Sequence, residues 1–285
     1  MDRLVSAAWL EKELGAPDLR ILDCTVSFGT LSDGTRGYRS GRPAWEEGHI
    51  PGSIHADLLH DLSDQSSPFP FMLPSAHQFS TVMGTLGVGD GTRVVLYDSF
   101  LNAWAARLWW MLRAFGFEEA GVLDGGWRAW TREGRPSSIE AAPSPSPTVF
   151  VARPRPGLFV GKEHVLAALD RTETCIVDAL GREAFRGERQ DYSRPGHIPG
   201  ARNVPFMEIV DRDTHRYLPA DALRQAFAAV LSAEPEEVIT YCGGGIAASS
   251  DAFCLSLLGI EDVAVYDGSL TEWTADPSLP LVVGN

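Results

Sequence analysis

The 285-residue sequence has few cysteines, no long apolar run and a deficit of basic side chains. Its cysteines are widely spaced and include no Cys-X-X-Cys pair, which argues against both a zinc site and a disulfide framework. No uninterrupted apolar stretch approaches the roughly 20 residues that span a bilayer. The N-terminal residues lack the apolar segment and cleavage site of a signal peptide. We therefore expect a soluble cytoplasmic protein with four reduced cysteines, Cys24, Cys175, Cys242 and Cys254.

The charge balance restricts the partners of the chain. The 24 lysines and arginines are outnumbered by 38 aspartates and glutamates, giving a formal net charge of −14. Such a charge argues against nucleic acid and against anionic membranes as main partners. A small anionic substrate would need local cationic side chains or backbone amides.

The chain repeats itself. Gly-His-Ile-Pro-Gly occurs at residues 48–52 and again at 196–200. Other pairs follow in the same order: 21–23 with 176–178, 94–98 with 238–242, 123–125 with 266–268, and Trp130 with Trp273. A segment rich in proline, serine and alanine separates the copies and is typical of an extended linker. The repeat predicts two similar domains, at 1–135 and 157–285, joined by a linker at 136–156.

Within each copy, short β-branched runs alternate with segments of helical periodicity. This alternation predicts an α/β fold, in which a mainly parallel sheet is flanked by helices on both faces. In the second copy we expect strands at 175–178, 238–241 and 263–266, and helices at 162–170, 220–231 and 246–258. In the first copy the segment 103–115 should be the counterpart of the helix at 246–258.

Cys242 has the setting of a reactive thiolate. It ends the apolar run 238–241 and precedes three glycines, Gly243, Gly244 and Gly245, which lead into the predicted helix. Glycines let the backbone curl so that consecutive N–H groups point to one anion, and the start of a helix adds positive potential. Both features favour the thiolate, so we predict that Cys242 is a nucleophile.

Other polar residues are weaker candidates for a catalytic role. His49 and His197 occur in both copies of the repeated turn, so we expect structural hydrogen bonds from them. Cys254 lies on the apolar face of the predicted helix and is expected in the core, although a resolving disulfide with Cys242 stays open. A cysteine phosphatase would need an arginine about six residues after its nucleophile. Residue 248 is alanine, which favours sulfur over phosphate chemistry.

In this order and in two copies, these elements resemble the tandem-domain rhodanese family of sulfurtransferases. The residues carrying the resemblance are Asp23 and Asp178, both Gly-His-Ile-Pro-Gly copies, Ser67-Pro68, Met72-Leu73-Pro74, the Cys242 loop, and the Asp-Gly turns before Trp130 and Trp273. The resemblance implies that only the second domain is catalytic, because Asp98 stands where the second copy has Cys242. It also implies an active site that faces the domain interface.

The resemblance further implies a ping-pong sulfur transfer. Cys242 would take a sulfane sulfur from thiosulfate or 3-mercaptopyruvate and pass it to cyanide, a small thiol or a thioredoxin-like protein. No metal or organic cofactor is expected. The anion cradle would consist of the amides of Gly243, Gly244, Gly245, Ile246 and Ala247. A carrier that only relays persulfide between other enzymes is the alternative.

The sequence departs from the family where the substrate binds. The cysteine loop has neither the basic pair of thiosulfate-preferring members nor the Gly-Ser-Gly-Val-Thr-Ala of mercaptopyruvate-preferring members. The family's substrate-binding arginine is replaced by Ala184, and the histidine before Met-Leu-Pro is replaced by Phe71. Arg186 and Arg182 are the candidate replacements for the anion clamp, and the preferred donor stays open.

Overall fold

The computed structural model describes residues 1–140 and 145–284, and these form two compact units. The first contains the described chain up to Arg155, together with Arg212–Arg216. The second begins at Pro156 and resumes at Tyr217 after that short segment. The boundary therefore falls at the end of the predicted linker, of which residues 141–144 lie outside the described chain.

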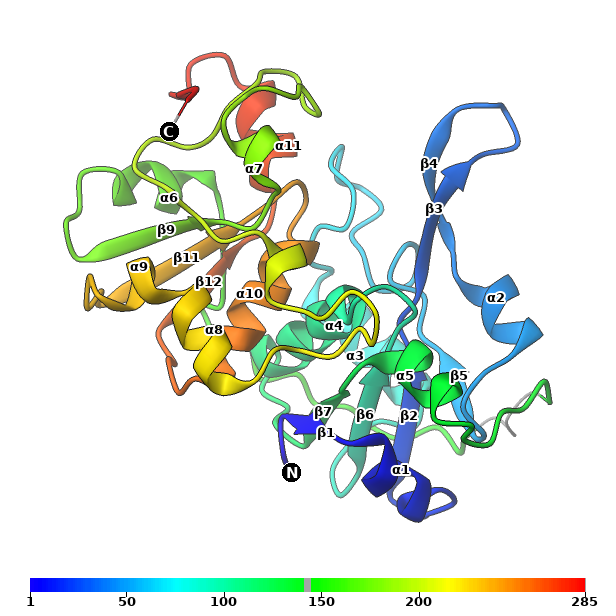
Figure 1. Ribbon diagram of the computed structural model, residues 1–285. Helices are drawn as coiled ribbons and strands as arrows, with labels where there is room; N and C mark the ends of the chain where they lie inside the picture. The colour runs from blue at the N-terminus through cyan, green and yellow to red at the C-terminus, as the bar shows by residue number, and fades with distance from the viewer. Residues whose placement is uncertain (141–144, 285) are drawn as a thin grey trace. The chain divides into compact units, whose positions relative to one another are not determined.

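The first unit is built on a parallel sheet with strand order β1-β7-β6-β2-β5 (Figure 1). Its strands are β1 (Leu4–Val5), β2 (Leu19–Asp23), β5 (Ser53–His55), β6 (Arg93–Tyr97) and β7 (Ala120–Leu123). Its helices are α1 (Ala7–Glu13), α2 (Arg42–Glu47), α3 (Ala76–Thr85), α4 (Ala103–Ala114) and α5 (Gly126–Arg132). A separate antiparallel hairpin consists of β3 (Val26–Thr30) and β4 (Arg36–Ser40).

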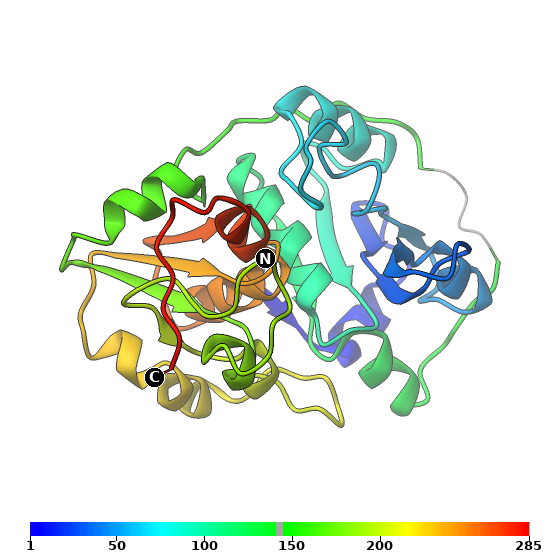
Figure 2. The ribbon, with the colours of Figure 1, turned by 90° about the horizontal axis from the view of Figure 1, so that it is seen from above.

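The second unit repeats this plan with strand order β10-β9-β11-β12-β8, again parallel (Figure 2). Its strands are β8 (Phe159–Val160), β9 (Thr174–Asp178), β10 (Arg202–Asn203), β11 (Glu237–Tyr241) and β12 (Val263–Tyr266). Its helices are α6 (Lys162–Ala168), α7 (Arg182–Phe185), the 3-10 turn η1 (Phe206–Glu208), α8 (Ala220–Ala226), α9 (Ala228–Leu231), α10 (Ile246–Leu257) and α11 (Ser269–Ala275).

Helices cover both faces of each sheet, as the sequence predicts. In the second unit, Ile239 and Tyr241 face the core shared with Val165 of α6 and Trp273 of α11. On the opposite face the Thr240 hydroxyl donates to the Ala248 carbonyl of α10. The first unit is arranged alike, with α1 and α5 on one face and α4 on the other. Side chains alternate across a strand, so both faces of these apolar strands are buried.

Three predicted helices differ from the observed ones. The segment 220–231 forms two short helices rather than one, because the backbone departs from helical geometry at Phe227, whose ring is fully buried. The helix from Lys162 ends at Ala168, two residues before its predicted end. The helix from Ile246 ends one residue early at Leu257, close to Gly259, which has the positive φ of +85° that glycine adopts readily.

The described part of the predicted linker packs along the first unit. Residues 145–155 contain no helix or strand. Their backbone is nevertheless hydrogen-bonded, with Thr148 N donating to Gly84 O at 3.0 Å and Arg153 N to Phe115 O at 2.8 Å. These bonds make this part of the linker a fixed edge of the first unit.

Candidate active site

Cys242 lies at the carboxyl end of β11, the central strand of the second sheet. In parallel α/β proteins, functional groups gather at this edge because the loops that follow the strands meet there. The cysteine is 3% exposed, so only a small part of its surface meets solvent. The loop 243–245 then leads into α10, which begins at Ile246. A strand-to-helix turn thus places the sulfur beside the amino end of a helix, as predicted.

Ser269 holds the loop in this conformation. Its hydroxyl oxygen accepts hydrogen bonds from Cys242 N at 3.1 Å and Gly245 N at 3.2 Å, and donates to Tyr266 O at 2.8 Å. The Gly245 amide is therefore engaged, which corrects the expectation that all five loop amides are open to an anion. The amides of Gly243, Gly244, Ile246 and Ala247 have no acceptor in residues 1–140 or 145–284.

The carbonyls of the loop are also held. Leu270 N donates to Cys242 O and Thr271 N to Gly243 O, both at 3.0 Å. The Thr271 hydroxyl donates to the same Gly243 carbonyl at 2.6 Å. With the carbonyls fixed from α11, the N–H side of the loop is left for an anion. The sequence singled out the Asp267-Gly268 turn but not the hydroxyls that follow it.

The first unit has the same loop, with a carboxylate in the cradle. Asp98 follows the central strand β6, as Cys242 follows β11. Its Oδ1 accepts from Phe100 N at 2.6 Å and Asn102 N at 3.1 Å, and its Oδ2 accepts from Ala105 N at 2.9 Å. Burial raises the pKa of Asp98 to about 7, although these amides pull it down. In the first unit the amides of this loop therefore bind the carboxyl group of Asp98.

Tyr192 lies against the first glycine of the cysteine loop. A Cβ atom added to Gly243 would stand 2.0 Å from the Tyr192 hydroxyl, closer than atoms can approach. The tyrosine packs against the core of the second unit, and two residues later the Arg194 guanidinium donates to the carbonyls of Thr274, Leu279, Trp273 and Asp276. Nothing in the sequence pattern signalled this tyrosine, because the contact joins segments about fifty residues apart.

The two arginines proposed as an anion clamp are both paired with carboxylates. Arg182 forms a bidentate pair with Glu208, and Arg186 forms one with Glu188 at 2.7 and 3.0 Å. Arg189 pairs with Asp191 in the same way. These pairs are largely exposed and therefore weak, so an anionic substrate could exchange for the carboxylate.

The repeated histidines have structural surroundings. His49 Nδ1 lies 2.7 Å from Trp45 O, and His197 Nδ1 lies 2.7 Å from Phe185 O. Each imidazole also stacks on the aromatic ring of the residue whose carbonyl it meets, with centroid separations of 4.1 Å for Trp45 and 3.6 Å for Phe185. Burial lowers the pKa of His197. This arrangement fits the structural role expected of both histidines.

Cys254 is fully buried in α10 and, like the other three cysteines, is a free thiol. It lies eight residues beyond Ile246, the first residue of the helix. At 1.5 Å per residue the separation from the helix start is about 12 Å. A disulfide brings its two Cα atoms within about 7 Å. The fold therefore favours the core role of Cys254 over a resolving role.

Two carboxyls are buried behind the cysteine loop. Burial raises the pKa of Asp178, at the end of β9, to about 6. Asp251 of α10 is also fully buried, and its oxygens have no hydrogen-bond partner in the described chain. Burial, and secondly the charge of Asp178, raise the pKa of Asp251 well above its ordinary value. Both effects favour the neutral form of Asp251 in the folded chain.

Asp251→Asn is expected to gain stability relative to the native protein as the pH rises. Above about pH 4 the unfolded native chain releases this proton, whereas the raised pKa of Asp251 makes the folded chain retain it to higher pH, so the native form loses stability. The asparagine variant has no such loss, so the difference should grow with pH, by at most about 1.4 kcal/mol per pH unit. Urea unfolding between pH 5 and 8 measures it, with the exposed Asp221→Asn as control. A difference that does not change with pH would contradict a neutral Asp251.

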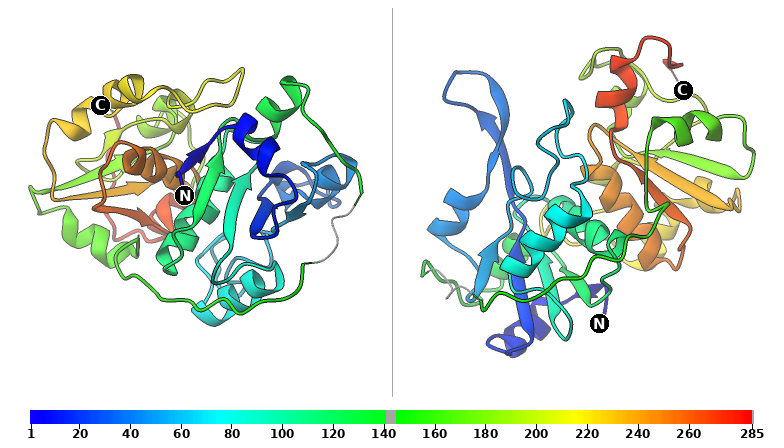
Figure 3. Two further views of the ribbon diagram at one scale, coloured as in Figure 1. Left: turned by 90° about the horizontal axis from the view of Figure 1, so that it is seen from below. Right: turned by 180° about the vertical axis from the view of Figure 1, so that it is seen from behind.

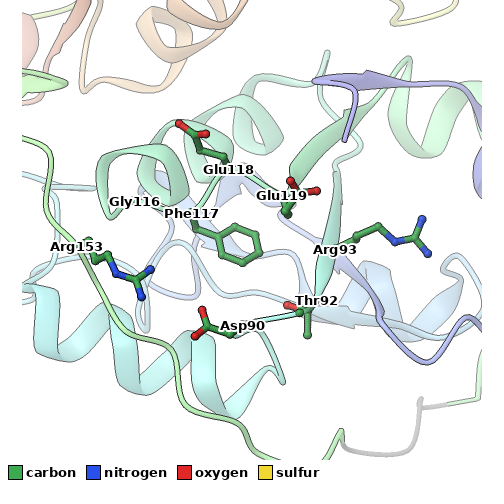
Figure 4. A pocket seen from close by; sticks show the side chains of 9 residues that line it. Asp90, Thr92, Arg93, Gly116, Phe117, Glu118, Glu119 and Arg153 are labelled. Carbon is green, nitrogen blue, oxygen red and sulfur yellow. The ribbon is translucent and has the colours of Figure 1, made fainter.

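A pocket of about 390 Å³ lies elsewhere, within the first unit (Figure 4). It adjoins Arg93, the first residue of β6, and so belongs to the amino edge of that sheet. Phe117 projects into it between Arg153 and Arg93 (Figure 4). Arg93 is paired with Asp18 and Glu13. No cysteine or histidine lines this pocket, so it offers no nucleophile.

A cysteine on a loop of open amides, at the carboxyl edge of a parallel sheet, defines an α/β protein suited to thiolate chemistry. The rhodanese-like domain model matches the chain twice, over residues 6–133 and 162–276. The chain therefore belongs to the rhodanese family, and its named relatives show that it is a sulfurtransferase. Among the described residues, none of the helices combines the length and apolarity needed to cross a membrane.

Named relatives cover nearly the whole chain. Human 3-mercaptopyruvate sulfurtransferase is 36% identical over 279 residues, covering 95% of this chain and 91% of that protein. Bovine thiosulfate sulfurtransferase is 35% identical over 280 residues with the same coverage. The crystal structure of the 3-mercaptopyruvate sulfotransferase SseA from Escherichia coli is 32% identical, covers 94% of this chain and 99% of that chain, and superposes with a TM-score of 0.83.

Proposed function

We propose that the chain transfers a sulfane sulfur from thiosulfate or 3-mercaptopyruvate, through a persulfide on Cys242, to cyanide or a thiol acceptor. The observation that carries this proposal is the difference between the two loops. Asp98 fills its own cradle with a carboxylate, whereas in the second unit four amides beside Cys242 are open. An open cradle next to a cysteine is suited to an anionic sulfur that arrives and leaves.

The two half-reactions balance without a further reactant. The Cys242 thiolate attacks the outer sulfur of thiosulfate, the S–S bond breaks, and sulfite leaves with the electron pair. With 3-mercaptopyruvate the C–S bond breaks instead, and the pyruvate enolate takes up the thiol proton. An acceptor nucleophile then attacks the outer sulfur of the persulfide, and the Cys242 thiolate is released. The amides of Gly243, Gly244, Ile246 and Ala247 would stabilise the negative charge at each stage.

The two units would divide the work. The second unit, 157–285, carries the nucleophile, and the first, 1–135, is non-catalytic because a carboxylate occupies its loop. Arg186 and Arg182 would bind the donor anion by exchanging their carboxylate partners for it. Neither a metal nor an organic cofactor is required. The four free thiols suit the reducing cytoplasm.

A persulfide on Cys242 can be detected directly. The native protein, incubated with either donor and no acceptor, is expected to gain the mass of one sulfur atom on the peptide containing Cys242. Cyanide should remove that mass. Modification of Cys24, Cys175 or Cys254 instead would contradict the assignment of the nucleophile, and no gain in mass with either donor would contradict the proposed function.

A persulfide relay is the second candidate, and the paired arginines favour it. If Arg182, Arg186 and Arg189 stay with their carboxylates, the loop has little cationic help for a small anion. A relay would form the persulfide from a protein donor but turn over neither small donor. Steady-state rates with thiosulfate and 3-mercaptopyruvate in parallel separate the two functions.

A further inference from the structure

The β3–β4 hairpin is an addition that the fold itself does not need. In the first unit α2 begins at Arg42, 19 residues after Asp23, and the hairpin fills the interval. In the second unit α7 begins at Arg182, four residues after Asp178, with no hairpin between them. The two sheets are otherwise alike. A segment that one copy of the fold omits is explained better by function than by folding.

The hairpin exposes two large aromatic side chains. Phe28 and Tyr38 are directly paired across the strands, and their rings make an edge contact at 5.1 Å. Phe28 is nevertheless 54% exposed and Tyr38 44% exposed. The hairpin pairs only with itself and projects from the first unit (Figures 1 and 3). Exposed aromatic rings of this kind are enriched at the centres of protein interfaces.

Three exposed arginines accompany the rings. Arg36 lies over the Phe28 ring, with its guanidinium carbon 5.0 Å from the centroid. Arg39 crosses Gly29, since a Cβ added there would stand 2.7 Å from the Arg39 guanidinium. Neither these two nor Arg42 forms an ion pair with any carboxylate of the described residues, although the chain carries a net charge of −14. The acidic Asp33 of the turn is engaged by Thr35.

The base of the hairpin is rigid. Tyr38 contacts Phe71 at 4.8 Å and Trp104 at 6.0 Å, and Phe71 contacts Trp104 at 5.0 Å. Both partners are buried in the first unit. Gly41 N closes the base by donating to Thr25 O at 3.1 Å. A rigid projecting surface loses little conformational entropy when a partner binds.

We propose that the hairpin surface formed by Phe28, Arg36, Tyr38, Arg39 and Arg42 docks an acidic protein that accepts the sulfur from this enzyme. A complementary partner would present carboxylates to the unpaired arginines and an apolar patch to the two aromatic rings. The hairpin projects from the first unit and exposes two rings, which suits a protein surface rather than a small anion. The strongly negative net charge of the chain opposes nucleic acid. This inference rests on the proposed function, because it concerns the second substrate of the same reaction.

The test compares two acceptors, cyanide and a reduced thioredoxin-like protein of net negative charge. Arg36→Glu/Arg39→Glu, and separately Phe28→Ala, are expected to raise KM for the protein acceptor by about tenfold or more, with cyanide kinetics unchanged. Added salt should raise that KM for the native enzyme and much less for the double variant. Arg212→Glu/Arg224→Glu changes the same net charge at exposed residues outside the hairpin and should leave KM unchanged.

Each other outcome is decisive. Unchanged KM for the protein acceptor in the hairpin variants, or native transfer to cyanide with none to the acidic protein, would overturn the docking surface while leaving the proposed function intact. If the native protein transferred no sulfur to cyanide, the proposed function itself would be contradicted. A dimer in sedimentation that the hairpin substitutions disperse would show that a second copy of the chain occupies this surface, and would overturn the acceptor assignment.

Discussion

Cys242→Ser is expected to abolish sulfur transfer from both donors. A serine hydroxyl ionises far less readily than a thiol and cannot form a persulfide, so no covalent intermediate is available. Removal of a covalent nucleophile typically costs several powers of ten in kcat, and at least about a thousandfold loss is expected here. The fold should be unaffected, because the substitution replaces one atom and retains the Ser269 bond to the backbone N–H.

Steady-state release of product with cyanide as acceptor measures this loss. The matched control is Cys254→Ser, which changes the same atom in the same helix-loop segment but should keep nearly native turnover per folded molecule. Retention of one-tenth of native activity by Cys242→Ser would show that another group carries the sulfur. Equal losses in both variants would restore the resolving role of Cys254.

Gly196→Ala is expected to destabilise the second unit strongly. Gly196 has a φ of +108°, and a Cβ there would lie 2.1 Å from the Val282 carbonyl oxygen. The obstacle is backbone, held in place by the reciprocal bonds between His197 and Val282 at 2.9 and 3.0 Å. Backbone strain and overpacking each cost about 1–3 kcal/mol, so a total near or above about 3 kcal/mol is expected. That corresponds to a fall in melting temperature of about 6 °C or more.

The repeat supplies the control for this experiment. Gly48 is the counterpart of Gly196 in the first Gly-His-Ile-Pro-Gly copy. It has an extended backbone with a φ of 175°, which any residue adopts, and an added Cβ would meet only the Trp127 ring at 3.4 Å. Gly48→Ala should therefore lower the calorimetric transition of the first unit only slightly. Similar shifts for the two variants would contradict the geometry described for Gly196.

The sequence predicted most of the framework because that part depends on local pattern. The two parallel sheets, the helices on both faces and the place of Cys242 follow from apolar periodicity, the repeat and the glycine run. The boundaries at Phe227 and Ala168 were missed because the burial of individual side chains determines them. Residues 21–23 and 176–178 predicted matching strands in the two copies. The β3–β4 hairpin that follows the first of these strands could not be inferred, because the second copy has no counterpart to it.

The missed parts of the site depend on contacts between distant segments. Ser269 reaches the amides of Cys242 and Gly245 from 24 or more residues away. Tyr192 meets Gly243 from the loop before the second Gly-His-Ile-Pro-Gly. The carboxylate partners of Arg182 and Arg186 likewise depend on where side chains extend in the folded chain. Residue types and spacing show that such groups exist, but the tertiary fold decides which of them meet.

Because of Asp98, the amides of the repeated loop are occupied in the first unit and open in the second. In the first unit the acceptor is the Asp98 carboxyl group of the polypeptide itself, so that loop needs nothing from solution to satisfy these amides. In the second unit, under the proposed function, the corresponding charge would belong to the sulfur that arrives and leaves with each turnover. The first loop is thus filled from within, whereas the second is held from outside by Ser269 and α11, which fix its shape while its remaining amides stay available to an anion.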